Sequence, residues 1–182
     1  MSTKKKLILS AITILNEDPS SNLDVIAKKA DVSRRTLHRY FTSREAMIQA
    51  CCESIVGSML ADVEEAIKIH TSPLDQLKKM FEDDLAKGQH LEFCQKFTDE
   101  FTDEEILVQF RKMGELFNNV LDKLKSKKLI DPTLSNDWLS YVWIGMIRTT
   151  NQALTEGVIA PKMANNLGWN AFINGVIIQK NK

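Results

Sequence analysis

The chain has 182 residues, of which 43% are hydrophobic and 26% charged, the composition of a globular protein with one large domain or a small domain joined to a larger one. Charges and amides interrupt the apolar stretches every few residues, so the sequence predicts no membrane-spanning segment. No cleavage site of a signal peptide follows the basic N-terminus, and three cysteines, two of them adjacent, do not form a disulfide framework. A reduced, cytoplasmic setting is therefore expected.

The charge is unevenly distributed, although the formal net charge is zero. The first 50 residues hold nine Lys and Arg against five Asp and Glu, so they carry +4 and the remainder carries −4. A basic N-terminal segment on an acidic body indicates that only one end of the chain meets a polyanion, provided that the basic residues lie on one face of a suitable motif.

The periodicity predicts an all-α fold. Glycine and proline are scarce, and apolar residues recur at spacings of three and four, as Leu7, Ile8, Ala11, Ile12 and Leu15 do. Helix start and stop signals place helices at about residues 4–15, 22–30, 33–40, 43–69, 73–88, 90–98, 103–127, 134–156 and 161–179. Ser33 and either Thr42 or Ser43 are the expected N-caps of the third and fourth helices, and Gly88 marks an expected break.

Residues 23–44 meet the packing requirements of a helix-turn-helix. Ala27 is small where two steeply crossed helices touch, and Ile26, Ala30, Val32 and Leu37 fall at shared core positions. Asp31 occupies the turn, where left-handed backbone is needed and Asp is one of the better substitutes for Gly. The outer face of the second helix then carries residues suited to base edges and phosphates, namely Arg34, Arg35, Thr36, His38 and Arg39. For any single one of these residues, simple solvation remains the alternative.

The same segment resembles the TetR/AcrR family of bacterial regulators. The resemblance covers roughly residues 5–50 and lies in the helix-turn-helix followed by Thr36-Leu37-His38-Arg39-Tyr40-Phe41 and then Ser43-Arg44-Glu45-Ala46-Met47. His38 stands where the family commonly has Tyr, Asp31 replaces a frequent Gly, and Arg44 replaces a usual Lys. The resemblance implies a DNA-binding domain at residues 1–45 and adds Arg44 and Tyr40 to the DNA-contacting set, with packing as the alternative for Tyr40. Ser33, at the start of the second helix of the motif, is a further candidate, as is Lys6, in the basic run before the first helix, for which a solvated chain end is the alternative.

The resemblance further implies that residues 46–182 form a helical ligand-sensing and dimerisation domain. Its candidate ligand-binding residues, for each of which ordinary core packing is the alternative, are Met59, Phe93, Phe97, Phe101, Phe110, Met113, Phe117, Trp143, Ile147 and Asn151. The last two helices resemble the pair that dimerises as a four-helix bundle, with the candidate interface residues Tyr141, Ile144, Gly145, Arg148, Leu167, Phe172, Ile173 and Val176.

The expected function is a ligand-responsive regulator, most often a repressor, which binds a palindromic DNA operator as a homodimer and is released by a small-molecule effector. An enzyme is disfavoured because the chain lacks a phosphate-binding Gly loop, a nucleophile elbow and a His-Glu-x-x-His pair. His70, His90 and Cys94 match no structural zinc spacing, and no metal or cofactor is expected. The second alternative is a dimeric helical sensor that does not bind a specific DNA sequence.

Overall fold

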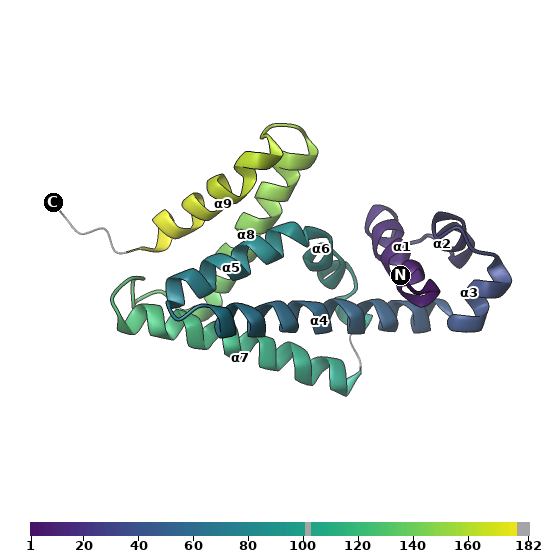
Figure 1. Cartoon of the computed structure of the whole chain (residues 1–182), viewed down its shortest axis with the longest axis horizontal. Helices are drawn as coiled ribbons and strands as arrows, with labels where there is room; N and C mark the ends of the chain where they lie inside the picture. The colour runs from purple at the N-terminus through teal and green to yellow at the C-terminus, as the bar shows by residue number, and fades with distance from the viewer. Residues whose placement is uncertain (101–102, 178–182) are drawn as a thin grey trace. The chain divides into compact units, whose positions relative to one another are not determined.

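The structure, a computed structural model, describes residues 1–100 and 103–177. Apart from an isolated antiparallel bridge between Ile130 and Ile177, these residues form helices and their connections, which confirms the predicted all-α class. The helices, labelled in Figure 1, are α1 (Thr3–Glu17), α2 (Leu23–Lys29), α3 (Arg34–Tyr40), α4 (Arg44–Ile69), α5 (Pro73–Ala86), α6 (Gly88–Lys96), the 3₁₀ turn η1 (Thr98–Glu100), α7 (Glu104–Ser126), α8 (Asn136–Thr155) and α9 (Pro161–Val176).

One predicted break is displaced. Gly88 was expected to interrupt the chain, whereas it is the first residue of α6 and the turn falls at Lys87. A glycine is needed there for a different reason, because a Cβ atom at position 88 would lie 2.1 Å from Nδ2 of Asn151. The glycine therefore leaves room for the Asn151 side chain, and the chain turns one residue earlier.

Two compact units divide the chain. The N-terminal unit consists of residues 1–58 and 89–110, and the C-terminal unit consists of residues 59–88 and 111 onward. The functional boundary expected after residue 45 stays a prediction, since the compact unit that holds the helix-turn-helix also contains α6 and half of α4.

The N-terminal unit packs the predicted apolar stripe of α1 into its core, where Leu7, Ala11 and Leu15 have no exposed surface. The cysteines Cys52 and Cys94 of this unit are packing residues rather than reactive thiols, because burial raises the pKa of each to about 12. Thiols with such pKa values stay protonated and are poor nucleophiles at neutral pH.

Polar contacts tie α6 and η1 to α1 and α4 within this unit. Asn16 donates its side-chain amide to the Gln89 carbonyl at 2.8 Å, and the Lys96 ammonium donates to the Asn16 carbonyl in the last turn of α1. A cation at that position complements the negative end of the helix dipole. Gln49 of α4 donates to the Glu100 carbonyl at 2.5 Å. These contacts tie residues 89–100 to the N-terminal unit, although Gln89 lies 73 residues from Asn16 in the sequence.

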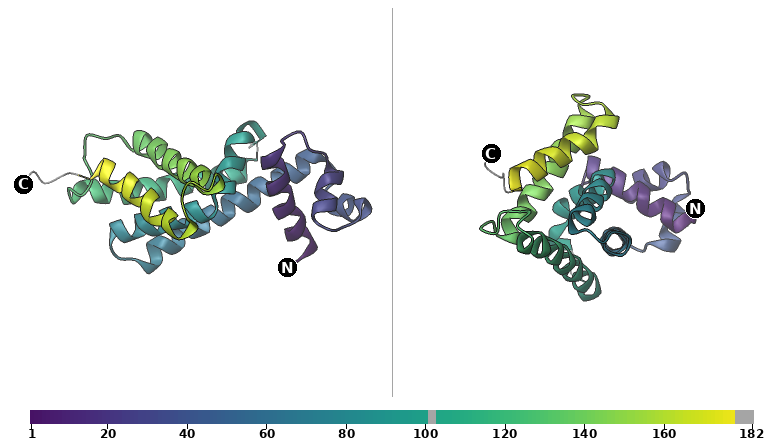
Figure 2. Two further views of the ribbon diagram at one scale, coloured as in Figure 1. Left: turned by 90° about the horizontal axis from the view of Figure 1, so that it is seen from above. Right: turned by 60° about the vertical axis from the view of Figure 1, so that its left-hand side comes forward.

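The C-terminal unit is built around aromatic rings. Phe81 of α5 packs edge-on against Trp143 of α8 with centroids 5.2 Å apart, and Phe172 of α9 lies 5.1 Å from Trp143. Helices α8 and α9 run side by side (Figure 2), and Gly168 lets α9 approach closely, since a Cβ there would lie 2.6 Å from Oγ1 of Thr150. Aromatic burial of this kind dominates the stability of a helical core.

Helix α4 is an exception to the expectation that no segment is apolar enough to span a bilayer. One 18-residue window of α4 has a mean hydropathy of 1.3, which meets the length and composition of a membrane span. Within the protein 56% of that window is buried. A core helix of a water-soluble protein passes the same test, and α4 packs more than half of this window inside the protein.

Candidate DNA-binding interface

Side-chain and backbone caps define the two helices of the motif. Asn22 caps α2, its Oδ1 accepting from the backbone N–H groups of Asp24 and Val25 at 3.0 and 3.2 Å. Ser33 caps α3 by accepting from the Thr36 N–H at 3.1 Å, which confirms its predicted role. Ser43 rather than Thr42 caps α4, with the Ala46 N–H at 3.2 Å from its Oγ. Such caps satisfy backbone donors that the helix itself leaves unpaired.

The turn between α2 and α3 is a Schellman motif centred on Asp31. Its φ angle is +54°, its N–H donates to the Lys28 carbonyl at 3.1 Å, and the Val32 N–H donates to the Ala27 carbonyl at 3.0 Å. This hydrogen-bond pair requires a left-handed residue at the position after the C-cap, which is usually Gly. The expectation that Asp31 would adopt that conformation is confirmed.

Most of the predicted core of the motif is also found, although Val32, expected in that core, is half-buried and lines a surface hollow. Ile26 and Leu37 are fully buried, and Ala27 and Ala30 keep 3% and 1% of their surface exposed. Phe41, which ends α3, is 3% exposed and anchors the helix from its C-terminal side. With these apolar side chains turned inward, the remaining residues of α3 face solvent.

The exposed face of α3 is basic. Arg35, His38 and Arg39 are exposed, and Thr36 is half-buried with its Oγ1 2.9 Å from that of Ser33. The Arg39 guanidinium stacks over the Tyr40 ring at 5.2 Å, so the two side chains restrict each other on the surface. The structure thus gathers Arg35, Thr36, His38, Arg39 and Tyr40 on one short helix.

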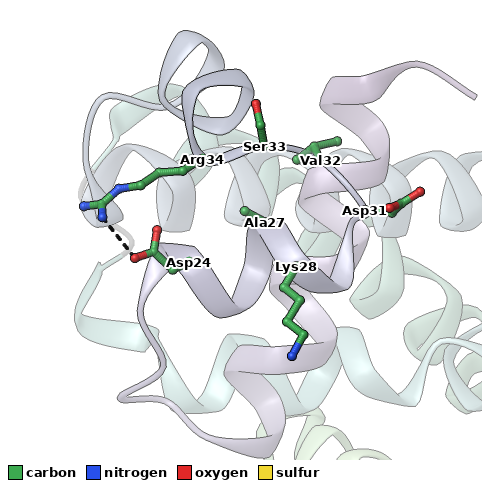
Figure 3. A pocket seen from close by; sticks show the side chains of 7 residues that line it. All are labelled: Asp24, Ala27, Lys28, Asp31, Val32, Ser33 and Arg34. Carbon is green, nitrogen blue, oxygen red and sulfur yellow. Dashed lines mark ion pairs between the residues drawn. The ribbon is translucent and has the colours of Figure 1, made fainter.

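Arg34 differs from its neighbours because its guanidinium pairs with Asp24 of α2 at 3.2 Å. A shallow hollow next to this pair (Figure 3) is lined by Asp24, Ala27, Lys28, Asp31, Val32, Ser33 and Arg34. Its two carboxylates balance its two cations, so the hollow has no net attraction for a phosphate. Arg34 must exchange its Asp24 partner for DNA before it can contact a base.

Two outlying members of the predicted DNA-contacting set are placed differently. Arg44 is half-buried, donates to the Pro19 carbonyl and lies over the Phe97 ring at 5.9 Å. Lys6 is half-buried on α1, outside the helix-turn-helix. The compact basic face is therefore formed by α3, and the contacts predicted for Arg44 and Lys6 remain predictions.

The predicted ligand-binding residues do not fall in one unit. Phe93, Phe97 and Phe110 belong to the N-terminal unit, where Phe93 and Phe97 are buried with ring centroids 4.4 Å apart and Phe110 is 45% exposed. Phe101 lies outside the described residues. The members in the C-terminal unit are Met59, Met113, Phe117, Trp143, Ile147 and Asn151.

The predicted dimer residues separate by exposure. Tyr141, Gly145, Arg148 and Leu167 are exposed, and Ile144 is half-buried. Phe172, Ile173 and Val176 instead pack inside the unit, with 0%, 6% and 3% of their surface exposed. The helical spacing of these three apolar residues places them in the core of the protomer, so they have little exposed surface with which to contact a partner.

Sequence reasoning missed two residues that the structure makes prominent. Trp138 of α8 is 57% exposed, an unusual state for a large apolar side chain on a helix that also carries Tyr141. Asp84 of α5 accepts a hydrogen bond from the Trp143 indole at 2.7 Å. The Trp138 position follows from the helical period of α8, whereas no local pattern links Asp84 to a residue 59 positions away.

A basic, exposed helix that is fixed by a Schellman turn against a preceding helix is the defining arrangement of helix-turn-helix DNA-binding proteins. Known sequences give the same result, since the model of the family described as bacterial regulatory proteins, tetR family, matches residues 20–51. The match covers the helix-turn-helix segment, and it identifies the chain as a DNA-binding transcriptional regulator similar to those of the TetR family.

Individual relatives resemble the chain along most of its length. The HTH-type transcriptional repressor LfrR of Mycolicibacterium smegmatis is 24% identical over 157 residues, which cover 86% of this chain and 81% of LfrR. The structure of LfrR in complex with proflavine has a TM-score of 0.73 at 20% identity, covering 97% of this chain and 98% of that one. The ketosteroid transcriptional regulator KstR2 of Mycobacterium tuberculosis has a TM-score of 0.71 at 17% identity, covering 98% and 96% of the two chains.

Proposed function

We propose that this protein is a cytoplasmic repressor which binds a palindromic operator as a homodimer and leaves it when a small molecule binds the C-terminal unit. The observation that carries the proposal is the exposed basic face of α3, whose orientation is fixed by the Ser33 cap and the Asp31 turn. The cap is a side-chain hydrogen bond and the turn a backbone one, and both are made within the motif, so the face can be presented to DNA without reorganisation of the motif.

The side chains of this face suit the major groove. Arg35 and Arg39 can each donate two parallel hydrogen bonds to a guanine edge or one to a phosphate, and the Thr36 methyl can contact thymine. His38 offers one ring nitrogen donor when neutral and two when protonated. A single seven-residue helix reads only a few base pairs, so a second copy is needed for operator specificity.

The exposed surfaces of α8 and α9 support a homodimer. Trp138 and Tyr141 are 57% and 75% exposed, and Met163 and Leu167 on α9 are 47% and 44% exposed. Gly145 is exposed, and a Cβ there would meet nothing within 4 Å, which leaves room for a partner helix. Large exposed apolar side chains of this kind are typical of interface cores. Two such subunits would bring their α3 helices to successive major grooves, about 34 Å apart.

The effector is proposed to be a small aromatic molecule. The support is the cluster of aromatic rings in the C-terminal unit and the relative LfrR, whose structure was solved in complex with proflavine. Binding would favour the arrangement of the two subunits that does not fit the operator, as an effector with different affinities for two states must do.

DNA binding is tested by selecting sites from random DNA with the full-length protein and measuring affinity by fluorescence anisotropy at several salt concentrations. We expect a palindromic site, a negative salt slope, and a loss of about 10-fold or more in the double variant Arg35→Ala, Arg39→Ala. Lys127→Ala, which removes an exposed charge from the C-terminal unit, is the matched control and should bind normally. Selection of no common sequence would contradict the proposal and favour a helical sensor without specific DNA binding.

The dimer is tested by light scattering coupled to gel filtration. Tyr141→Arg places a charge on the proposed interface and should convert the dimer to a monomer with weak operator binding. Glu105→Arg, at an exposed position of α7, is the control that keeps the dimer. A wild-type protein that is monomeric at operator-binding concentrations would rule out this assembly.

A further inference from the structure

Arg44 joins the two ends of the segment that contains the helix-turn-helix. Its guanidinium donates to the carbonyl of Pro19, 25 residues earlier in the sequence, and both helices of the motif, α2 and α3, lie between these two residues. Because Pro19 precedes α2 and Arg44 begins α4, this hydrogen bond closes the segment into a loop. A closed loop has fewer arrangements than an open one, so the bond restricts how α2 and α3 move as a pair.

The Pro19 end of this loop is held in a turn by Asp18. The Asp18 carboxylate accepts from the Ser20 N–H at 2.9 Å, from the Ser20 hydroxyl at 2.7 Å and from the Ser21 hydroxyl at 3.1 Å. The Ser21 N–H also donates to the Asp18 carbonyl at 3.1 Å. Asp side chains that bond to the backbone two residues on are typical of ordered turns. The Pro19 carbonyl is therefore presented to Arg44 by a defined turn, directly before the Asn22 cap of α2.

An aromatic ring holds the Arg44 guanidinium from the other side. Its Cζ lies 5.9 Å from the centre of the Phe97 ring, within the range of a cation–π contact. Phe97 directly follows α6, is 5% exposed and packs against Phe93 with ring centroids 4.4 Å apart, so its ring is fixed in place. Arg44 thus connects the turn before α2 to the end of α6.

The chain at the end of α6 is itself fastened to the N-terminal unit. The Lys96 ammonium donates to the Asn16 carbonyl of α1, and Gln49 of α4 donates to the Glu100 carbonyl at 2.5 Å. These contacts join α1, α4 and the chain after α6 into one base. Arg44 is the residue that fastens the start of the helix-turn-helix to this base.

We propose that Arg44 is a positioning residue for operator binding rather than a phosphate contact, and that it sets the orientation of α3 by tying the turn at Pro19 to Phe97. The proposal rests on the proposed operator binding and deepens it. A planar guanidinium can donate to a carbonyl and stack on a ring at the same time, whereas a lysine ammonium is a compact point charge. A lysine would serve well in a phosphate contact but would not replace this tie.

Arg44→Lys separates the two roles because it keeps the positive charge and removes the planar group. We expect the affinity of the full-length protein for the selected operator, measured by fluorescence anisotropy, to fall by about 3- to 10-fold with an unchanged salt slope. Arg111→Lys makes the same exchange at an exposed position of α7 and should alter the affinity by less than about 2-fold. Operator binding by Arg44→Lys at the wild-type level would overturn the proposal.

Phe97→Leu tests the aromatic side of the tie without changing a charge, so a loss of operator affinity in it cannot come from a lost phosphate contact. We expect a loss of about 3- to 10-fold at a temperature where the variant is folded. The double variant Arg44→Lys, Phe97→Leu should lose no more than about 2-fold beyond the larger single loss, because both changes break the same tie.

Phe93→Leu is the matched control for this second test. It removes the neighbouring, fully buried ring and should lower stability at least as much, while changing operator affinity by less than about 2-fold. Additive losses in the double variant, or an equal loss of operator affinity in Phe93→Leu, would contradict a tie between Arg44 and Phe97. If Phe97→Leu does not fold, Arg44→Lys at its half-buried position still decides the question.

Hydrogen exchange followed by NMR tests the tie in the absence of DNA. In Arg44→Lys the Ser21 amide, which is held by the Asp18 carbonyl, should exchange about 3- to 10-fold faster than in the wild type. The Leu37 amide, which donates to the Ser33 carbonyl at 3.0 Å inside the motif, should exchange at the same rate in both proteins. Unchanged exchange at Ser21 would refute the tie.

These outcomes differ from a failure of the proposed function, which would be seen as no common sequence in the DNA selection with the wild type. An operator that wild type and Arg44→Lys bind equally well would leave the proposed function intact and remove only the positioning role of Arg44.

Discussion

The two units of this protein relate function to stability in opposite ways. In the N-terminal unit the side chains proposed to contact DNA, such as Arg35 and His38, are exposed, and the side chains that hold the motif, such as Ile26 and Leu37, are buried. In the C-terminal unit one residue would serve both purposes, since Trp143 is a candidate ligand contact and is only 4% exposed. We therefore expect substitutions that remove DNA binding to leave the first unit folded, and substitutions of buried ligand contacts in the second unit to reduce stability as well.

The physical reason is the size and polarity of the two partners. A DNA duplex is a large polyanion that is met on a surface, where basic side chains keep their water until contact. A small aromatic ligand must be largely enclosed, so its contacts are drawn from the residues that form the core. The comparison predicts how substitutions in each unit divide between stability and binding.

Trp143→Ala should have the largest effect on folding. It removes ring contacts with Phe81, Phe117 and Phe172 and leaves Asp84 without its indole donor, so the free energy of unfolding should fall by about 3–5 kcal/mol. His38→Ala, on the exposed face of α3, should change it by less than about 0.5 kcal/mol. Urea denaturation followed by circular dichroism measures both. Similar losses in the two variants would remove the distinction between the units.

Gly168→Ala should be the next most damaging change. Its Cβ would lie 2.6 Å from Oγ1 of Thr150 and 3.0 Å from Cζ of Phe81, and Thr150 is held by a 2.7 Å hydrogen bond to the Met146 carbonyl. We expect a loss of about 1–3 kcal/mol from overpacking. Gly175→Ala in the same helix meets nothing within 4 Å and should gain about 0.5–1 kcal/mol from helix propensity. A gain at both positions would mean that α8 and α9 pack less tightly than described.

These residues also show what could be predicted from the sequence. The helix-turn-helix was predictable because its determinants, the Asn22 and Ser33 caps, the Asp31 turn and the small residue Ala27, lie within about a dozen residues of one another and act locally. Periodicity likewise predicted helix bounds to within a few residues. Which segment packs over each face of a helix depends on residues that are distant in the sequence. For this reason Phe172, Ile173 and Val176 were predicted at an interface although they lie in the core.

The same limitation applies to the candidate ligand site. Aromatic residues were singled out as a class, but their division between two compact units could not be inferred from their spacing. Asp84 was missed because its environment comes from Trp143, and an acidic residue in an amphipathic helix is ordinarily solvated. Long-range polar contacts such as that of Asn16 with Gln89 leave no local pattern either.

Arg35→Ala should weaken operator binding by about 1–3 kcal/mol without changing stability, because the side chain is exposed and has no role in the core. Arg34→Ala should cost less, since Arg34 must first give up its 3.2 Å pair with Asp24. Anisotropy titrations over a range of salt distinguish the two roles. A phosphate contact reduces the salt slope by about one and affects all sequences alike, whereas a base contact relaxes the preference at one position. A larger loss from Arg34→Ala would show that the Asp24 pair is absent in the DNA complex.

The smallest expected effect concerns a backbone motif that both units share. Asp31 in the N-terminal unit and Lys128 in the C-terminal unit have φ angles of +54° and +55° and form the same pair of hydrogen bonds, which Gly157 forms as well, at a φ of +70°. Replacing Lys128 with Gly should stabilise the protein by about 0.5–1 kcal/mol, because a left-handed conformation is strained for an L-residue with an ordinary side chain.

Asp31→Gly should gain less than Lys128→Gly, since Asp tolerates this conformation better. Thermal unfolding of the two variants, with Gly157→Ala as a control that should lose about 1 kcal/mol, measures the order. If Asp31→Gly stabilises the protein but weakens operator binding, the Asp31 side chain contributes to the orientation of α3 beyond its backbone angle. That result would mean that Asp31 contributes to both stability and binding, as proposed for Trp143 in the C-terminal unit. The two units would then differ less in how they separate stability from binding.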